Sequence, residues 1–346
     1  MEGTSSRWRG VLPAVLLAAL FAYAAWPWLP FARADRNPPT IVFYGFSILA
    51  DAFHDGIFPA FQKRWAAEGG GRVEFVSSFG GSGTVTNQIA MGVPAQVALL
   101  SLESDADRLA DAGVIARDSW KRLPNSGVLN LTPFIIVVRP GNPLGIRGFE
   151  DLAKPGVRVV HPDPMTSGGA NWAIVAEYGS GFRGSPGGPA AGEAVLAGVW
   201  KNVVAQAASA RAARTQFENG FGDALVTYEQ DALYDKGRGR LRADVAYPPR
   251  TILSEHTLIV VDRNVRPRER ALVDRFVRFL WSDEAQRVFV RFGFRSVRPE
   301  LDAANPGFGR IADPFRIADF GGWKRARREI VDGIWKDRVM KAAPTR

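Results

Sequence analysis

Two glycine-rich turns carry the residues of this chain that are best suited to bind a ligand. The first, Phe79-Gly80-Gly81-Ser82-Gly83-Thr84, follows an apolar run at residues 73–77 and leads into a helical pattern. The second, residues 162–169, stands in the same way between an apolar run at 157–160 and a helical pattern. One such turn also fits an ordinary strand-to-helix connection. Two of them predict a clamp for a small oxyanion, because backbone N–H groups at a helix start bind anions and glycine permits close approach.

The motifs that would make these turns catalytic are missing. No Gly-Lys pair is present for a P-loop, and Gly81-Ser82-Gly83 lacks the third glycine of a dinucleotide fingerprint. Neither G-x-S-x-G nor H-E-x-x-H occurs, so Ser82 and Ser167 lack the context of a nucleophile. We therefore expect a binding protein and not an enzyme.

The composition excludes further classes of site. The 346 residues include no cysteine and three histidines, His54, His161 and His256, that lie far apart. Thiolate zinc sites, iron–sulfur clusters and cysteine nucleophiles are excluded, and we expect neither a metal nor a cofactor. The formal net charge is +9, but the basic residues are spread thinly, so nucleic acid is not an expected partner.

Short apolar runs alternate with helical patterns along the chain. The expected strands are residues 40–44, 73–77, 97–101, 134–138, 157–160, 224–228 and 258–261. The expected helices are 48–67, kinked or restarted at Pro59, then 268–281 and 283–292, while the Gly/Ser/Pro-rich stretch 179–189 predicts a surface loop. The alternation predicts an α/β fold with parallel strands and crossover helices, in which ligands bind beyond the carboxyl ends of the strands.

In these turns and in further motifs, the chain resembles the periplasmic sulfate-binding proteins of ATP-binding-cassette (ABC) importers over nearly all of its length after residue 34. The most specific stretch is Asp163-Pro164-Met165-Thr166-Ser167-Gly168-Gly169-Ala170-Asn171-Trp172. The other matching motifs are Gly80-Gly81-Ser82-Gly83, Trp120-Lys121-Arg122-Leu123-Pro124, Val137-Val138-Arg139-Pro140-Gly141-Asn142-Pro143, Pro155-Gly156-Val157, Ala210-Arg211, Gly220-Phe221-Gly222-Asp223 and Phe320-Gly321-Gly322-Trp323.

The resemblance implies a two-lobed periplasmic binding protein fold of type II, each lobe a mostly parallel sheet flanked by helices. Residues 38–128 and 229–295 are expected to form lobe 1 and residues 133–225 lobe 2, with 296–346 as a C-terminal helical segment packed across the lobes. The implied function is capture of sulfate between the lobes by N–H and hydroxyl donors, followed by delivery to the permease subunits of an ABC importer. A monomer is expected.

The anion-binding residues are likewise implied by the resemblance. Ser82 from one lobe, and Ser167, Gly168, Gly169 and Ala210 from the other, are expected to bind sulfate, with Ser167 donating its hydroxyl. Arg211 is implied as a neighbour that supports a binding loop without having to touch the ion.

The chain departs from the family pattern at two places. Where the family has Tyr-Asp-Pro-Thr, this chain has Tyr44-Gly45-Phe46-Ser47, so Gly45, Phe46 and Ser47 are expected at the site, with Gly45 able to supply the main-chain N–H. Where the family has an indole donor, this chain has Tyr228, whose phenol can donate or accept a hydrogen bond.

Proton counting favours sulfate over phosphate in a pocket made only of donors. Phosphate keeps a proton at neutral pH, and an O–H facing an N–H leaves both unpaired. Asp163 and Asp223 are expected near the site and would be acceptors. Thiosulfate, molybdate or another tetrahedral oxyanion stays an alternative ligand. A lower-ranked alternative is a hydrolase of sulfate or phosphate esters, which would require a base such as His161 or an aspartate beside the hydroxyl of Ser82 or Ser167.

Residues 1–34 predict an export signal. Arg7 and Arg9 precede a nearly continuous apolar stretch at residues 11–31, and Ala32-Arg33-Ala34 has the small-x-small pattern of a signal-peptidase site. The alternative is an uncleaved membrane anchor, since about 20 apolar residues can span a bilayer. Either way, the folded part is expected in the periplasm.

Overall fold

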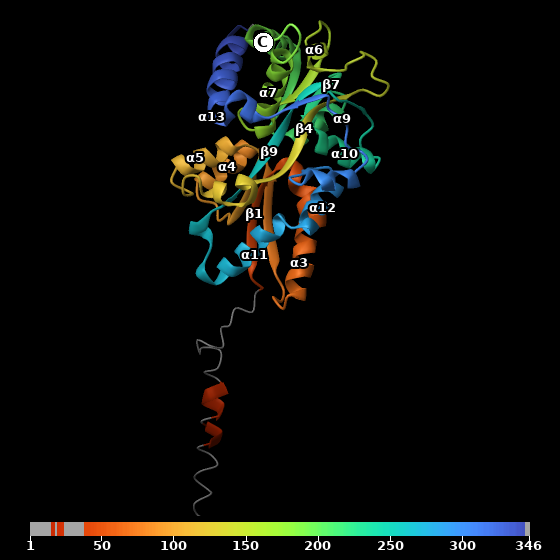
Figure 1. Ribbon diagram of the computed structural model, residues 1–346. Coiled ribbons are helices and arrows are strands. Elements are labelled where there is room, and N and C mark those ends of the chain that lie inside the picture. Colours follow the sequence, from red (N-terminus) through yellow and green to blue (C-terminus); the bar gives the residue numbers. More distant parts are fainter. Residues whose placement is uncertain (1–14, 18, 24–37, 343–346) are drawn as a thin grey trace, which may run out of the picture.

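The structure, a computed structural model, describes residues 15–17, 19–23 and 38–342 (Figure 1). Its strands are β1 (Thr40–Phe46), β2 (Glu74–Gly80), β3 (Val97–Leu100), β4 (Val128–Val138), β5 (Val159–Pro162), β6 (Val203–Ala207), β7 (Ala224–Tyr228), β8 (Asp244–Ala246), β9 (Arg250–Val260), β10 (Arg295–Ser296) and β11 (Asp313–Phe315).

The α-helices are α2 (Ala50–Ala52), α3 (Phe58–Ala67), α4 (Ser82–Ala90), α5 (Glu103–Asp111), α6 (Phe149–Leu152), α7 (Gly168–Phe182), α8 (Pro189–Lys201), α9 (Ala210–Glu218), α10 (Glu229–Gly237), α11 (Arg270–Leu280), α12 (Asp283–Arg291), α13 (Gly322–Ala326) and α14 (Met340–Ala342). Short 3₁₀ turns are η2 (Ser47–Leu49), η4 (Ser119–Arg122), η5 (Pro124–Gly127), η6 (Asp262–Asn264), η7 (Pro267–Glu269), η8 (Pro299–Ala304) and η9 (Ile317–Phe320). Two segments are wound as π-helix, η3 (Phe53–Ile57) and η10 (Arg327–Val339).

The strands form one path of hydrogen-bonded neighbours in the order β2-β1-β3-β9-β4-β7-β5-β6. β1 is parallel to β2 and β3, and β5 is parallel to β6 and β7. Between these parallel groups, β9 and β4 are antiparallel to each other. Residues 130–133 of β4 pair with β9, whereas residues 134–138 pair with β7. The path therefore consists of two parallel groups joined by two long strands.

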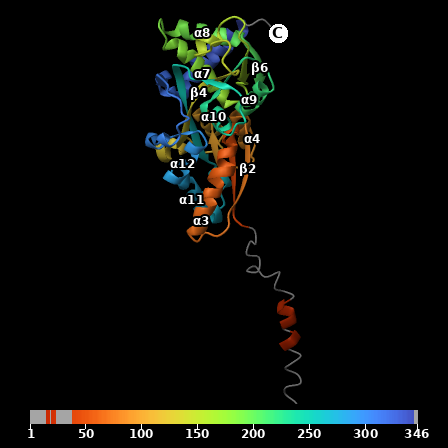
Figure 2. The ribbon, with the colours of Figure 1, turned by 90° about the vertical axis from the view of Figure 1, so that its right-hand side faces the viewer.

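Helices cover both faces of each parallel group, as expected for an α/β fold. Figures 1 and 2 place α3, α11 and α12 with β1 and β2 in the lower part, and α7 and α9 in the upper part. The lower group is the parallel group β1–β3 with its helices, and the upper group is the parallel group β5–β7 with its helices. Side chains alternate across the sheet: Val97 and Leu99 of β3 face the cluster around α3 and α11, while Ala98 and Leu100 face the cluster under α4 and α5. The α/β fold with flanking helices is confirmed.

One local prediction needs correction. The expected loop at 179–189 is in part helix, because α7 runs to Phe182 and only residues 183–188 lie between it and α8. The glycines at this end of α7 permit close packing against neighbouring elements. A Cβ at Gly179 would lie 2.4 Å from the Phe315 ring, and a Cβ at Gly181 would lie 2.5 Å from the backbone of Ala191. The restart expected at Pro59 is confirmed, because α3 begins at Phe58 after the π-helical segment η3 and has Pro59 in its first turn, where its missing N–H is tolerated.

The C-terminal segment packs onto the helices of the upper group. The indole of Trp323 lies 4.5 Å from that of Trp172 on α7, and Trp335 lies 4.9 Å from Trp200 on α8. Within the range expected for lobe 1, β8 pairs with residues 136–138 of β4, in the half of β4 that also pairs with β7. The lobe boundaries stay a prediction.

The predicted export signal falls mostly outside the described residues, including its Ala32-Arg33-Ala34 motif. Residues 15–17 and 19–23 are helical. Within the described ranges, no helix is long and apolar enough to cross a membrane.

Candidate anion-binding site

The site lies where the carboxyl ends of the two parallel groups meet. β1, β2 and β3 end at Phe46, Gly80 and Leu100, and β5, β6 and β7 end at Pro162, Ala207 and Tyr228. The chain then enters a helix or a helical turn after nearly every one of these strand ends. Helix starts leave N–H groups without a carbonyl partner in their own helix, so this arrangement concentrates backbone donors in one place.

The structure brings the two glycine-rich turns into direct contact. The N–H of Gly83 donates to the carbonyl of Thr166 at 3.0 Å. A Cβ on Gly81 would lie 2.4 Å from the Thr166 carbonyl oxygen and 2.5 Å from that of Ala208. Position 81 therefore has to be glycine for the turns to approach this closely.

The second turn begins α7. Ser167 is the residue before the helix, and Gly168 and Gly169 are its first two residues. A Cβ on Gly168 would lie 2.7 Å from the Cβ of Ser101 and 2.9 Å from that of Ser82, both in the lower group. A Cβ on Gly169 would meet the Tyr228 ring at 2.9 Å. Gly168 thus lets the lower group approach the start of α7, and Gly169 leaves room for the Tyr228 ring at the end of β7.

Three further predicted residues also stand at helix starts. Ser82 is the first residue of α4 and Ala210 the first of α9, and they are 1% and 3% exposed. Ser209 accepts the N–H of Ala212 and caps α9. Tyr228 precedes α10 and is 1% exposed. Ser167 is buried as well, and within residues 38–342 its hydroxyl has no hydrogen-bond partner.

The side chain of Ser82 contacts the buried carboxylate of Asp105. The Ser82 hydroxyl donates to Oδ2 of Asp105 at 2.6 Å and accepts the N–H of Ser101 at 3.0 Å. Burial raises the pKa of Asp105, against the hydrogen bond from Ser82 and the nearby Arg108 guanidinium. Arg108 lies 3.3 Å from Oδ1. Both oxygens of Asp105 therefore have partners in the lower group.

Tyr228 has a partner that the sequence did not indicate. Its hydroxyl lies 2.8 Å from Oγ of Ser101, the residue directly after β3. Burial raises the pKa of Tyr228 well above its usual range, so the phenol keeps its proton. The carbonyl of Ser101 accepts the indole N–H of Trp172 at 2.7 Å. Trp172 belongs to α7, so this hydrogen bond reaches from the upper group to the lower group.

The Gly45-Phe46-Ser47 segment reaches the same region. Phe46 and Ser47 are buried, the Phe46 ring lies 6.0 Å from that of Tyr228, and η2 packs against α9. A Cβ on Gly45 would come within 2.9 Å of the Phe79 ring. An aspartate at position 45 would thus have to displace Phe79, which explains in part why glycine stands there.

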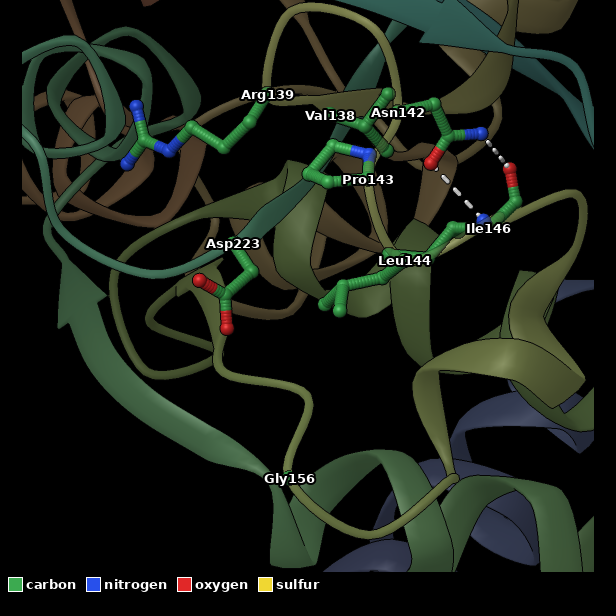
Figure 3. A pocket seen from close by; sticks show the side chains of 8 residues that line it. All are labelled: Val138, Arg139, Asn142, Pro143, Leu144, Ile146, Gly156 and Asp223. Atoms are coloured by element: carbon green, nitrogen blue, oxygen red, sulfur yellow. Dashed lines mark hydrogen bonds between the residues drawn. The ribbon is translucent and has the colours of Figure 1, made fainter.

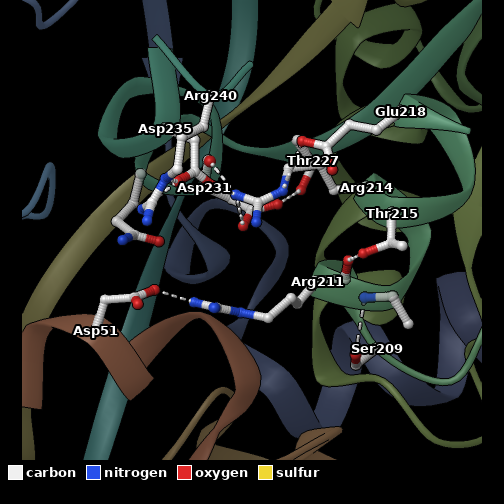
Figure 4. Close-up of polar contacts among 12 residues, drawn as sticks. Asp51, Ser209, Arg211, Arg214, Thr215, Glu218, Thr227, Asp231, Asp235 and Arg240 are labelled. Carbon is white, nitrogen blue, oxygen red and sulfur yellow. Dashed lines mark hydrogen bonds and ion pairs between the residues drawn. The ribbon is translucent and has the colours of Figure 1, made fainter. Parts of the chain in front are cut away.

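Arg211, expected to support a binding loop, connects the two groups. From α9 it forms an ion pair with Asp51 on α2 (Figure 4). Burial would raise the pKa of Asp51, but its contact with Arg211 prevails and holds that pKa below its usual value. One turn further along α9, Arg214 pairs with Asp231 at 3.0 Å and with Asp235. The guanidinium of Arg211 is directed at Asp51.

The two aspartates expected near the site have structural partners. Asp163 caps the second turn by accepting the N–H of Met165 at 2.8 Å. Asp223 is paired with Arg158 at 2.8 Å and lines a separate cavity of about 140 Å³ together with Arg139 and Asn142 (Figure 3). That cavity contains none of the residues predicted to bind the anion. Asp223 therefore does not belong to the site.

His161, named above as a possible base for the hydrolase alternative, lies within a strand. It is fully buried in β5, and its Nε2 lies 3.2 Å from Oε1 of Glu177 on α7, an acid that sequence spacing did not reveal. Ser101, Asp105 and Asp51 were not singled out either. Only Ser101 carried a signal, since it ends an expected strand. In the described part of the chain, no group of three or more His, Asp or Glu side chains could hold a metal ion.

Comparisons with known proteins agree with the fold. Residues 48–295 match the family model described as bacterial extracellular solute-binding protein. A sulfate-binding protein of Synechococcus elongatus is 34% identical, with 89% of this chain and 87% of that protein covered. A thiosulfate-binding protein of Pseudomonas aeruginosa is 32% identical over 83% of this chain and 88% of its own. The solved structure of the sulfate-binding protein SubI from Mycobacterium tuberculosis H37Rv superposes with a TM-score of 0.76 at 30% identity, covering 84% of this chain and 99% of that one.

Proposed function

The chain belongs to the bacterial extracellular solute-binding proteins, and from this premise we propose that it binds sulfate between its two glycine-rich turns and presents it to the membrane subunits of an ABC importer. The sulfate- and thiosulfate-binding relatives support an oxyanion as the ligand. The site residues of the proposal are Gly45, Phe46, Ser47, Ser82, Ser167, Gly168, Gly169, Ala210 and Tyr228, with Arg211 as support.

The observation that carries the proposal is the meeting of helix starts from both groups. Gly168 at the start of α7 lies against Ser82 at the start of α4, and Gly169 lies against Tyr228 at the start of α10. Each helix contributes partial positive charge and free N–H groups. A dianion without protons can accept from all of these donors.

Selectivity against phosphate follows from the positions of the acceptors. A hydrogen phosphate ion needs an acceptor for its proton, and a missing one costs about 1–3 kcal/mol. Asp105, the carboxylate next to Ser82, has one oxygen on the Ser82 hydroxyl and the other near Arg108. Both oxygens are thus directed at partners within the protein, which favours sulfate over phosphate.

Calorimetric titration of the purified chain with sulfate, thiosulfate, molybdate and phosphate tests the proposal. We expect micromolar or tighter binding of sulfate, little change in Kd between about pH 6 and 8, and no binding of phosphate. Thiosulfate or molybdate binding more tightly than sulfate would replace the ligand but keep the site. An absence of heat with all four anions, or a steep pH dependence, would refute the proposal.

A second function, ester hydrolysis, is favoured by one observation, the 2.6 Å contact between Ser82 and Asp105. An aspartate beside a serine hydroxyl is the feature such an enzyme requires. Against it, Ser82 is 1% exposed and its oxygen also accepts the Ser101 N–H. Turnover of 4-nitrophenyl sulfate or 4-nitrophenyl phosphate that disappears in Ser82→Ala would establish the enzyme; we expect none.

The proposal includes export, a monomeric state and a hinge. Closure of the lobes would bend β4 and β9, the two long strands that join the parallel groups. Light scattering is expected to give the mass of one chain, and N-terminal sequencing of the exported protein is expected to start after Ala34. A mature chain that keeps Met1 would instead support the uncleaved anchor.

A further inference from the structure

Ser101 joins the candidate site at a point where the lower and upper groups touch. It is fully buried directly after β3, and its Oγ lies 2.8 Å from the hydroxyl of Tyr228 at the end of β7. Its backbone is held on both sides, because its N–H donates to Ser82 and its carbonyl accepts from Trp172. The position of the Ser101 hydroxyl is therefore fixed by three contacts that tie it to the other residues of the site.

The Ser101 and Tyr228 hydroxyls border the first residues of α7. A Cβ on Gly168 would lie 2.8 Å from Oγ of Ser101, and a Cβ on Gly169 would lie 3.0 Å from the Tyr228 hydroxyl oxygen. An anion held by the N–H groups of Gly168 and Gly169 would thus have both hydroxyls as neighbours.

Counting protons shows what this hydroxyl pair can offer. Each hydroxyl has one proton, and the single bond between the two oxygens uses one of the two. Within residues 38–342, neither hydroxyl has another partner. One proton is left over in either orientation of the shared bond, and a proton left unpaired in a buried site is costly.

We propose that Ser101 is a ligand-binding residue that, together with Tyr228, donates the remaining proton to an oxygen of the bound anion. This inference rests on the proposed function, because it assigns a donor to the same site. The two hydroxyls act as one donor unit: one oxygen accepts from its neighbour, and the polarised neighbour donates to the anion. Ser101 also favours sulfate over thiosulfate, because oxygen is a better hydrogen-bond acceptor than terminal sulfur.

The test is a double-mutant cycle read by calorimetry on the full chain, with sulfate and thiosulfate as the probes. We expect Ser101→Ala and Tyr228→Phe each to raise the Kd for sulfate by about tenfold or more. In the double variant, the Kd for sulfate should rise by much less than the product of the two single-variant fold-increases, because the pair supplies one proton. In Ser101→Ala, the ratio of thiosulfate Kd to sulfate Kd should fall at least about threefold, a change that a general loss of stability would not produce.

Ser180→Ala is the matched control. Ser180 is also a fully buried serine, but its hydroxyl donates to Glu150 on α6 and lies outside the site. Its variant should keep the wild-type Kd for both anions while unfolding at a lower temperature.

The outcomes separate this inference from the proposed function. If the wild-type chain binds none of the four anions, the proposed function fails. If the wild-type chain binds sulfate but Ser101→Ala keeps the wild-type Kd, the role of Ser101 is refuted while the site stands. The same holds if the fold-increase in Kd of the double variant equals the product of the two single fold-increases. Should Ser101→Ala fail to fold, Ser101→Cys, with a weaker donor at the same place, is expected to give the same direction of change.

Discussion

The hydroxyl of Ser82 donates to Oδ2 of Asp105, 2.6 Å away, so its proton is already used within the protein. Ser167, on the opposite turn, has a hydroxyl with no partner in the described part of the chain. Both serines stand at helix starts, Ser82 as the first residue of α4 and Ser167 as the residue before α7, but only the Ser82 hydroxyl proton has a partner among the described residues. The Ser82 side chain stabilises the lower group, whereas that of Ser167 is available to a ligand.

Alanine variants of the two serines should therefore affect different properties, sulfate affinity for Ser167 and the free energy of unfolding for Ser82. Ser167→Ala removes a donor to a charged group, so we expect sulfate affinity to fall about 10- to 150-fold with little change in the free energy of unfolding. Ser82→Ala leaves Asp105 buried without its donor and should lower the free energy of unfolding by about 1–3 kcal/mol, with a smaller effect on affinity. Calorimetry and urea unfolding measure both. Equal effects of the two variants on affinity would contradict the assignment.

Gly168→Asp should abolish sulfate binding. Its Cβ would lie 2.7 Å from that of Ser101, and its carboxylate would face the dianion. We expect a loss of about 100-fold or more in affinity, measured by calorimetry, with an unchanged circular dichroism spectrum. The control is Gly237→Asp at the end of α10, where a Cβ has open space. Binding that survives in Gly168→Asp would place the site elsewhere.

Asp51→Asn tests the contact between the two groups. It breaks the ion pair with Arg211, which follows Ala210 at the start of α9. Both side chains are partly exposed, so we expect only about a two- to fivefold weaker sulfate affinity, and a smaller difference in about 1 M salt. Glu68→Gln is the control, because Glu68 pairs with Arg64 within the lower group, far from α9. An equal effect of the control would show that charge alone, not the contact between groups, is responsible.

His256 should make the fold sensitive to mild acid. It is buried on β9, with Asn130 of the neighbouring β4 and Ser254 as hydrogen-bond partners, and burial lowers the pKa of His256 from its usual 6.5 to about 3. The unfolded chain takes up this proton below about pH 6.5 while the folded chain does not. The stability that the neutral ring contributes is thus fully present above that pH and is lost as the pH falls toward 3, by up to about 1.4 kcal/mol per pH unit.

The matched variant is His256→Gln, compared with the wild-type chain by urea unfolding between about pH 7 and 4. The variant is expected to start at a lower stability, because it loses the ring contacts, but to fall less steeply with pH. The wild-type chain and the variant falling in parallel would show that His256 is protonated in the fold.

The sequence revealed the parts of the site whose chemistry is local. Each glycine turn stands between a strand and a helix within a dozen residues, so its pattern could be detected directly. Asp105 is 23 residues from Ser82, and Asp51 is 160 residues from Arg211, and no spacing rule connects such pairs before the chain is folded. The helical end of α7 was missed for a related reason: Gly179 and Gly181 disfavour helix locally, but their contacts with Phe315 and Ala191 override that preference. β6 was missed because only its first and last residues are buried.

The hydrogen bond from Gly83 to Thr166 joins the turns themselves, at their closest approach. A captured ion would lie beside backbone that is already hydrogen-bonded from one turn to the other. Its residence time would then depend on how often the halves swing apart and only weakly on the strength of any one donor. A transporter that separates the two turns would therefore release the anion quickly, even if the Kd of the free protein is low.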